Sequence, residues 1–346
     1  MSPYVLSIAL SSLSIGTLTT LISHHWFLAW AGLEINTLAI IPLMIKQHHP
    51  RAVESTTKYF LVQASASALI LFSALINAWA AGEWMILNTH TPASSLMITI
   101  ALAMKLGITP FHLWLPDVLQ GLNLFTCLIM ATWQKLAPLA LLILMHNQLN
   151  TPLLMVMALL SALVGGWGGL NQTHLRKIMA YSSTAHLGWM LMVVTFSPNL
   201  MILNLLIYLM LTSSMFMTLL ILSAYNINQL SMSWVKNPTM MAVLMVVLVA
   251  LGGLPPTTGF MPKLLILLEL IKHGMTIMAF MLAVATLLSL FFYIRLSYMI
   301  SLTTSPSSSN SKFNWRLKNK TFMLMPLLAV LSCTLLPVTP MLMNLI

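Results

Sequence analysis

Charged residues are scarce in this sequence, and their scarcity excludes most classes of soluble protein. Only 6% of the 346 residues are charged, with 15 Lys or Arg and 5 Asp or Glu, whereas soluble domains contain about 25%. A chain that is 59% hydrophobic cannot cover a soluble surface with so few charges. Soluble enzymes, nucleic-acid-binding proteins and disordered chains are therefore excluded, and a membrane protein is expected.

Cysteine is nearly absent as well. The 2 cysteines, Cys127 and Cys333, lie in apolar runs, so we expect neither a disulfide framework nor a cysteine-bound cluster. No haem, flavin or quinone motif is found either, and we expect no cofactor and no metal in this chain. Methionine is abundant instead, with 29 residues, as expected if ATA codons are read as Met in animal mitochondria.

Long hydrophobic runs dominate what is present. A transmembrane helix needs roughly 20 apolar residues, and the sequence offers eleven candidate spans. It therefore predicts an all-α, polytopic membrane protein. The expected spans are 3–22, 25–46, 53–80, 93–119, 123–145, 152–170, 174–196, 199–224, 239–271, 275–300 and 323–343.

The basic residues predict the orientation, because loops on the cytoplasmic or matrix side carry the excess of Lys and Arg. The loop side opposite to that excess carries only Lys272. The N-terminus is therefore expected on the positively charged side, which is the matrix or the cytoplasm, and the C-terminus on the other. The net charge of +10 reflects this topology. The loops after even-numbered spans carry Lys46, Arg51, Lys58, Arg176, Lys177, Lys236, Arg295, Lys312, Arg316, Lys318 and Lys320.

Four charged residues lie deep inside the expected spans, away from the span ends: Glu34, Lys105, Lys135 and Lys263. A charge at the centre of a bilayer costs about 2.5–3.5 kcal/mol even on lenient scales, so such residues are functional candidates. A static ion pair that locks two helices together is the simpler interpretation. One central acid cannot pair with three lysines, however, so we favour proton transfer.

Two histidines accompany these charges. His112 follows Lys105 after Pro110, and His186 is central in the span 174–196. An imidazole titrates near neutral pH and can pass a proton between its two nitrogens. Each is a candidate relay residue, although a single histidine in a helix is as often a structural hydrogen-bonding residue.

Glycine and proline interrupt two of the spans, and each interruption lies beside a lysine. Such breaks occur where helices line a wet cavity, and paired breaks in an inverted repeat are typical of transporters. We therefore expect two inverted five-helix repeats, 1–146 and 147–301, each with a broken fourth helix. An exposed polar connection and a last helix are expected over 302–346. The interrupting residues are Gly107, Pro110, Gly252, Gly253, Pro255, Pro256, Gly259 and Pro262.

Three motifs carry a resemblance to a known family. They are KLGITPFHLWLPD at 105–117, LRKIMAYSSTAHLGW at 175–189 and GGLPPTTGFMPK at 252–263. Together they resemble the antiporter-like membrane subunits of respiratory complex I, the NADH:ubiquinone oxidoreductase, of animal mitochondria. Bacterial members have three more N-terminal helices, which is consistent with eleven spans here.

The resemblance implies a role for each candidate residue. Glu34 would pair with Lys105, Lys135 would be central in a lateral proton path, and Lys263 would pass protons to the exit side. The remaining candidates, His112 and His186, would be relay residues. Proton translocation coupled to quinone reduction is the activity implied, without electron transfer in this chain.

The resemblance also implies a setting. FMN, iron–sulfur clusters and ubiquinone would belong to other subunits. Partners would be other membrane-arm subunits, accessory subunits and phospholipids such as cardiolipin, and no nucleic acid is expected. The location would be the mitochondrial inner membrane, with the chain encoded by mitochondrial DNA.

Two alternatives remain open. A free-standing cation/proton antiporter subunit would have the same spans, and the absence of redox subunits on purification would identify it. A purely structural membrane scaffold would tolerate neutral residues at all four buried charges.

Overall fold

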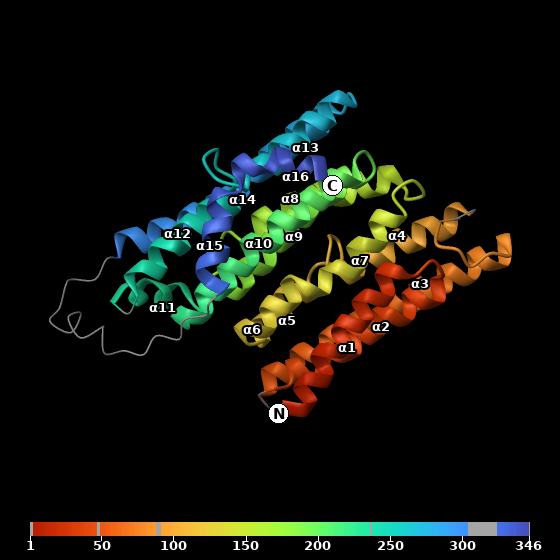
Figure 1. The fold of residues 1–346 in the computed structure, drawn as a ribbon, viewed down its shortest axis with the longest axis horizontal. Coiled ribbons are helices and arrows are strands. Elements are labelled where there is room, and N and C mark those ends of the chain that lie inside the picture. The colour runs from red at the N-terminus through yellow and green to blue at the C-terminus, as the bar shows by residue number, and fades with distance from the viewer. Residues whose placement is uncertain (1–2, 47–48, 88–90, 236, 304–323, 346) are drawn as a thin grey trace. The chain divides into compact units, whose positions relative to one another are not determined.

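The computed structural model describes residues 3–46, 49–87, 91–235, 237–303 and 324–345, which form helices and contain no strand (Figure 1). This confirms the all-helical fold class. By its internal contacts the chain divides into two units, Met1–Ser161 and Ala162–Ile346. The division falls inside a helix, α8, beyond the repeat boundary expected after residue 146.

The first unit is built from pairs of adjacent helices, in which α1 packs along α2 and α3 packs along α4 and α5. His25 begins α2, and its Nδ1 accepts a hydrogen bond from the Phe27 backbone N–H at 3.1 Å. This contact satisfies one of the amide groups that every helix start leaves without a partner. The helices are α1 (Pro3–Ile22), α2 (Trp26–Met44), α3 (Pro50–Ala81), α4 (Pro92–Leu106), α5 (Trp114–Gly121), α6 (Leu124–Ala131), α7 (Trp133–Leu144) and α8 (Thr151–Gly168).

The second unit is organised around one long helix, α10, which packs against α9, α12 and α15. Most residues of α9 are buried, so this helix lies in the core of its unit despite its Ser, Thr and His side chains. The helices are α9 (Leu175–Val194), α10 (Pro198–Leu222), α11 (Ile227–Ser231), η1 (Met232–Val235), α12 (Pro238–Gly252), α13 (Phe260–Lys272), α14 (Thr276–Leu302), α15 (Leu324–Thr334), η3 (Leu336–Val338) and α16 (Thr339–Leu345).

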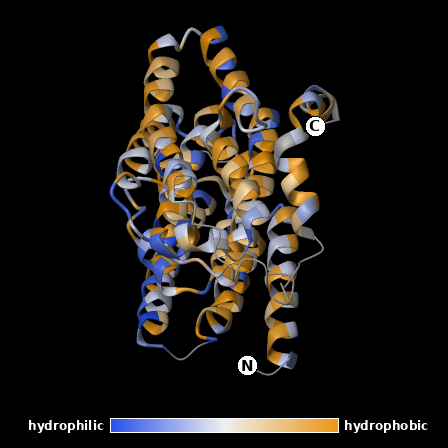
Figure 2. Ribbon diagram, turned by 90° about the vertical axis from the view of Figure 1, so that its left-hand side faces the viewer, coloured by the Kyte–Doolittle hydropathy of each residue, from blue (hydrophilic) through white to orange (hydrophobic). Residues whose placement is uncertain are grey.

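Seven helices of the described residues are long and apolar enough to cross a membrane, or 8 if the bent pair near the C-terminus is one span. Hydrophobic residues dominate most of the helical ribbon (Figure 2), and the chain is a multi-pass membrane protein. The expected number of eleven spans stays a prediction. The number of helices that meet this criterion is lower than eleven because α4 and α12 are only 15 residues long and because α9 is rich in polar residues.

The helix bounds otherwise follow the expected spans. Four of the expected spans are divided. The span 93–119 is divided into α4 and α5, the span 123–145 into α6 and α7, the span 239–271 into α12 and α13, and the span 323–343 into α15, η3 and α16. A short helix, α11, was not expected from the sequence. The polar connection expected before the last helix lies in residues 304–323, outside the described residues, as do Lys236 and the basic residues of that connection.

Each unit also contains one isolated pair of bridged backbone segments. In the first, His25 just before α2 pairs with Met85 after α3; in the second, His174 just before α9 pairs with Asn226 after α10. In both units, therefore, the segment before one helix is joined to the segment that follows the next long helix.

Candidate functional site

The buried charges expected from the sequence are indeed removed from the surface. The side chains concerned are exposed by 9% or less, whereas Glu34 is partly exposed. Burial inside a membrane protein is costly for an ammonium group, so each lysine requires a local source of stabilisation. The exposed fractions are 6% for Lys105, 4% for Lys135, 9% for Lys263, 9% for His112 and 9% for His186.

Lys105 lies in the last turn of α4, where the helix stops at Gly107. Gly107 has φ 75°, a left-handed conformation that glycine adopts without strain. The Ile108 N–H then bonds to the Ala103 carbonyl at 3.0 Å, which closes the helix end. A cation in this turn interacts favourably with the negative end of the helix dipole.

A buried glutamine completes this helix end. Gln63, on α3, donates from Nε2 to the Lys105 carbonyl oxygen at 3.3 Å. It thereby satisfies one of the carbonyl groups that the break in α4 leaves without an intrahelical partner. Lys105 Nζ itself is buried and has no hydrogen-bond partner among the described residues. The ammonium group is therefore stabilised by electrostatic attraction rather than by a fixed hydrogen bond.

Glu34 is the carboxylate that acts on Lys105 electrostatically. The family resemblance implied an ion pair, but no N···O contact within 4.0 Å joins these two side chains in the part of the chain described. Instead Glu34 Oε2 accepts a hydrogen bond from Thr37 Oγ1 at 2.9 Å. Thr37 is one helical turn away from Glu34 on α2, so its hydroxyl lies within hydrogen-bonding distance of the carboxylate.

Lys135 lies in the first turn of α7, which packs against α1, α2 and α4. Its neighbour Gln134 donates from Nε2 to the Asn36 carbonyl oxygen at 3.4 Å. Asn36 belongs to the same helix as Glu34. One interhelical bond thus fixes the start of α7 against the helix of Glu34, and α4 brings Lys105 to the same unit.

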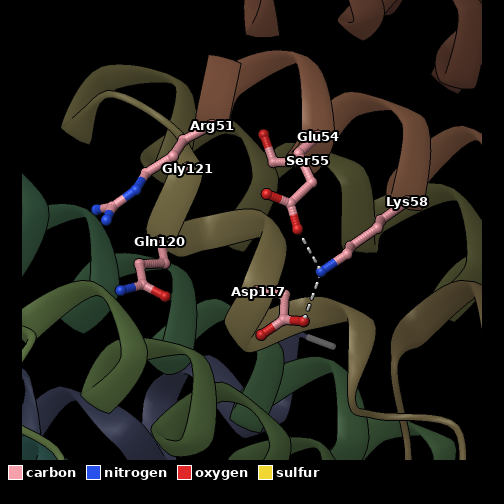
Figure 3. A pocket seen from close by; sticks show the side chains of 7 residues that line it. All are labelled: Arg51, Glu54, Ser55, Lys58, Asp117, Gln120 and Gly121. Carbon is pink, nitrogen blue, oxygen red and sulfur yellow. Dashed lines mark hydrogen bonds and ion pairs between the residues drawn. The ribbon is translucent and has the colours of Figure 1, made fainter. Parts of the chain in front are cut away.

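Asp117, at the end of the same motif as Lys105, belongs to a surface cluster rather than to the buried set (Figure 3). Lys58 Nζ is 2.9 Å from Glu54 Oε1 and 3.1 Å from Asp117 Oδ2. Roughly half of the Asp117 side chain is exposed, at 48%. The three side chains line a cavity of about 210 Å³ between α3 and α5. Exposed pairs of this kind contribute at most about 1 kcal/mol.

Lys263 stands at the second break, and the structure gives it a specific partner. Its Nζ donates to the carbonyl oxygen of Gly252, the last residue of α12, at 2.9 Å. Lys263 belongs to the first turn of α13, so its ammonium reaches back from one helix start to the preceding helix end. There it meets both a free carbonyl and the negative end of the α12 dipole.

The two breaks have the same backbone design. Both α4 and α12 have 15 residues, begin with proline in the first turn and end before a left-handed glycine. Gly253 has φ 78°, and Leu254 N–H bonds back to the Val249 carbonyl at 3.5 Å. The freed carbonyl groups are satisfied differently, by Gln63 in the first unit and by Lys263 in the second.

His186, in the core helix α9, shares a small cavity with Lys263. Tyr208 also lines it, with its ring centroid 5.4 Å from that of His186. The second unit thus brings His186 and Lys263 together, while the first brings Glu34, Lys105, Lys135 and His112 into one unit. No group of three or more His, Cys, Asp or Glu that could hold a metal is found among the described residues.

The sequence reading missed several uncharged polar residues of the site. Thr37 bonds to the Glu34 carboxylate and Gln63 to the backbone carbonyl of Lys105. Asn204 lines the cavity beside His186. The sequence feature that could have indicated these residues is an amide or hydroxyl side chain inside an apolar span. This feature is weak, because Ser and Thr are common in such spans. Chemically, the arrangement provides buried groups that can hold a proton.

Two family descriptions match the chain and together cover nearly all of it. Residues 23–289 match the membrane domain of NADH:quinone oxidoreductases and Mrp antiporters, and residues 290–343 match the NADH dehydrogenase subunit 2 C-terminus. NADH-ubiquinone oxidoreductase chain 2 of Squalus acanthias is 54% identical, over 98% of both chains. The same protein of Salmo salar is 55% identical, again over 98% of both chains.

Solved structures share the fold. A chain of respiratory complex I from Thermus thermophilus has a TM-score of 0.86 and 24% identity, over 99% of this chain and 80% of that one. A chain of the Mrp complex from Dietzia has a TM-score of 0.78 and 15% identity, over 96% and 75%. The chain therefore belongs to the NADH-ubiquinone oxidoreductase chain 2 family, the antiporter-like membrane subunits of respiratory complex I.

Proposed function

We propose that this subunit translocates protons, and that it couples quinone reduction elsewhere in complex I to pumping. The proton-carrying residues would be Glu34, Lys105, Lys135 and Lys263, with His112 and His186 as relay residues. The observation that supports this proposal is that, among the described residues, neither Lys105 nor Lys263 is paired with a carboxylate by a hydrogen bond. Lys105 Nζ has no hydrogen-bond partner in the described part of the chain, and Lys263 bonds to a neutral carbonyl.

That observation favours transfer over a static lock. A structural ion pair needs a carboxylate in contact with the amine, because an uncompensated buried charge is strongly destabilising. Among the described residues Lys263 bonds only to a carbonyl oxygen, and Glu34 bonds to Thr37. An ammonium that is not fixed by a carboxylate can lose its proton to a neighbour when the local field changes.

The mechanism begins at Glu34. Quinone reduction in another subunit would change the charge or hydration beside this carboxylate and weaken its attraction for the Lys105 ammonium. The Lys105 proton would then move toward Lys135. In the second unit the proton would pass by His186 to Lys263, and repulsion from the next incoming proton would drive its release.

The finer architecture is part of the proposal. We infer two five-helix repeats, 1–146 and 147–301, in a chain of eleven spans. The matching helix ends at Gly107 and Gly253 and the paired bridges at His25 and His174 support them. An odd number of spans per repeat would make the two repeats opposite in orientation, as in other transporter folds.

The setting follows from the same family. The chain would lie in the mitochondrial inner membrane, with its N-terminus on the matrix side, where its loops carry Lys and Arg. It would contact other membrane-arm and accessory subunits and phospholipids such as cardiolipin, and mitochondrial DNA would encode it. FMN, iron–sulfur clusters and ubiquinone would be held by other subunits.

The test is proton pumping by the assembled complex carrying Lys105→Met, reconstituted in proteoliposomes. We expect fewer protons pumped per electron, or slower turnover, because methionine keeps the length of the side chain and cannot hold a proton. Lys58→Met, a half-exposed lysine of the same unit, is the matched control and should pump normally. Normal pumping per electron by an assembled Lys105→Met complex would rule out the assignment.

A further inference from the structure

The cavity beside His186 has the size of one water molecule. Its volume is about 10 Å³, near the smallest space that holds a water. His186, Tyr208 and Lys263 line it, together with apolar residues of α10. A water is retained in such a space only if two to four polar groups bond to it.

Asn204, on α10, is a polar residue of this lining that the proposed relay does not use. Its side chain is 4% exposed, and its amide Nδ2 is buried with no hydrogen-bond partner among the described residues. A buried amide without a partner is costly. If this position served packing alone, a leucine would fill it better, as at its neighbours Leu203 and Leu205 on the same apolar helix.

The donors and acceptors around the cavity suit one water. The Lys263 ammonium has three donors, and within the described part of the chain only one of them is used, in the bond to the Gly252 carbonyl. A second donor of Lys263 and the Asn204 amide can both give hydrogen bonds to a water oxygen. An imidazole nitrogen without a proton accepts a hydrogen bond, so that water can in turn donate to a ring nitrogen of His186.

We infer that Asn204 is a positioning residue that holds a single water between His186 and Lys263. An amide does not titrate in the working pH range, so Asn204 does not itself carry the proton. It fixes the oxygen of the water, and the proton moves from one side chain to the water while a water proton moves to the other side chain. This inference rests on the proposed function, since a bridging water matters only if Lys263 exchanges protons.

The test compares Asn204→Leu with Asn204→Ser in the assembled complex in proteoliposomes. Leucine removes the amide but keeps the volume similar, and losing one hydrogen bond to the water should lower the rate of proton pumping about fivefold. Serine keeps a hydroxyl and leaves room for a second water, so it should restore most of the rate. Thr218→Val is the control, because its buried hydroxyl bonds only to the Met215 carbonyl of the same helix, at 2.7 Å.

A map of the bound water distinguishes a positioning role of Asn204 from a purely structural role. A density map of the unmodified complex that resolves waters should show one water within hydrogen-bonding distance of Asn204, Lys263 and His186. A dry cavity in that map overturns the inference, even if Asn204→Leu fails to assemble. Equal pumping rates for Asn204→Leu and Thr218→Val also overturn it.

Lys263→Met separates this inference from the proposed function. If Lys263→Met pumps normally, the proposed function itself fails. If Lys263→Met stops pumping while Asn204→Leu pumps at the parent rate, the relay stands and only the role of Asn204 is refuted.

Discussion

Replacing Gly253 by alanine should disturb both the second helix break and the lysine that caps it. Gly253 has φ 78°, and a left-handed conformation costs a residue with a Cβ about 1–2 kcal/mol. A Cβ at this position would also stand 2.8 Å from Lys263 Nζ, so this side chain must shift, and we expect the shift to break its bond to the Gly252 carbonyl. Losing that charge-assisted hydrogen bond costs about 1.5–3 kcal/mol more.

The chain provides a matched control in Gly274. It has φ 75°, yet a Cβ there would meet nothing within 4 Å, so Gly274→Ala carries the backbone strain alone. Unfolding of the full chain in mixed detergent micelles, followed by circular dichroism, measures the free energy of both variants. Gly253→Ala should be the less stable of the two by about 1.5–3 kcal/mol.

A double-mutant cycle sharpens the comparison, because it isolates the interaction between Gly253 and Lys263. In a Lys263→Met background, Gly253→Ala should cost only the backbone strain, about 1–2 kcal/mol. If Gly253→Ala and Gly274→Ala are equally destabilising in the parent chain, Lys263 does not cap α12 and the reasoning is refuted.

The remaining predictions concern the first unit. Gln63→Leu leaves the Lys105 carbonyl without its buried donor and should reduce the free energy of unfolding by about 1–3 kcal/mol; an unchanged value would show that the break needs no such bond. Asp117→Asn removes one carboxylate from the exposed pair with Lys58 and should change stability by less than about 1 kcal/mol. It should also leave protons pumped per electron unchanged in proteoliposomes, and a large loss would place Asp117 in the proton path.

Much of the fold could be predicted because hydrophobic length and helix breakers are local properties of the chain. The span 3–22 coincides with α1, and the glycines and prolines predicted the ends of α4 and α12. The burial of Lys105 and Lys263 followed from their position in apolar runs, since no other environment is available there.

The contacts of the site could not be predicted, because they depend on segments distant in the sequence. Nothing near Gln63 in the sequence indicates that its amide satisfies the carbonyl of Lys105. The family resemblance implied a Glu34–Lys105 ion pair, whereas the structure gives Glu34 a hydrogen bond from Thr37. Competition between a local donor and a distant charge is decided by side-chain geometry, which spacing in the sequence does not contain.

The relation between the two breaks also became clearer in the structure. From the sequence, Lys105 and Lys263 appear as counterparts because each lies beside a break. When the helix-ending glycines Gly107 and Gly253 are aligned, however, Lys263 coincides with Asp117. The two lysines therefore approach their breaks from opposite sides, Lys105 in the helix before the break and Lys263 in the helix after it.

The most direct test of the central claim is the number of protons pumped per electron by an assembled complex with Lys263→Met. The control is Lys272→Met on the same helix, whose side chain is 71% exposed and pairs with Glu269 on the surface. Proton transfer through the buried lysines predicts a reduced ratio for Lys263→Met and the parent ratio for Lys272→Met. The parent ratio in both complexes, at normal electron transfer, would contradict the account.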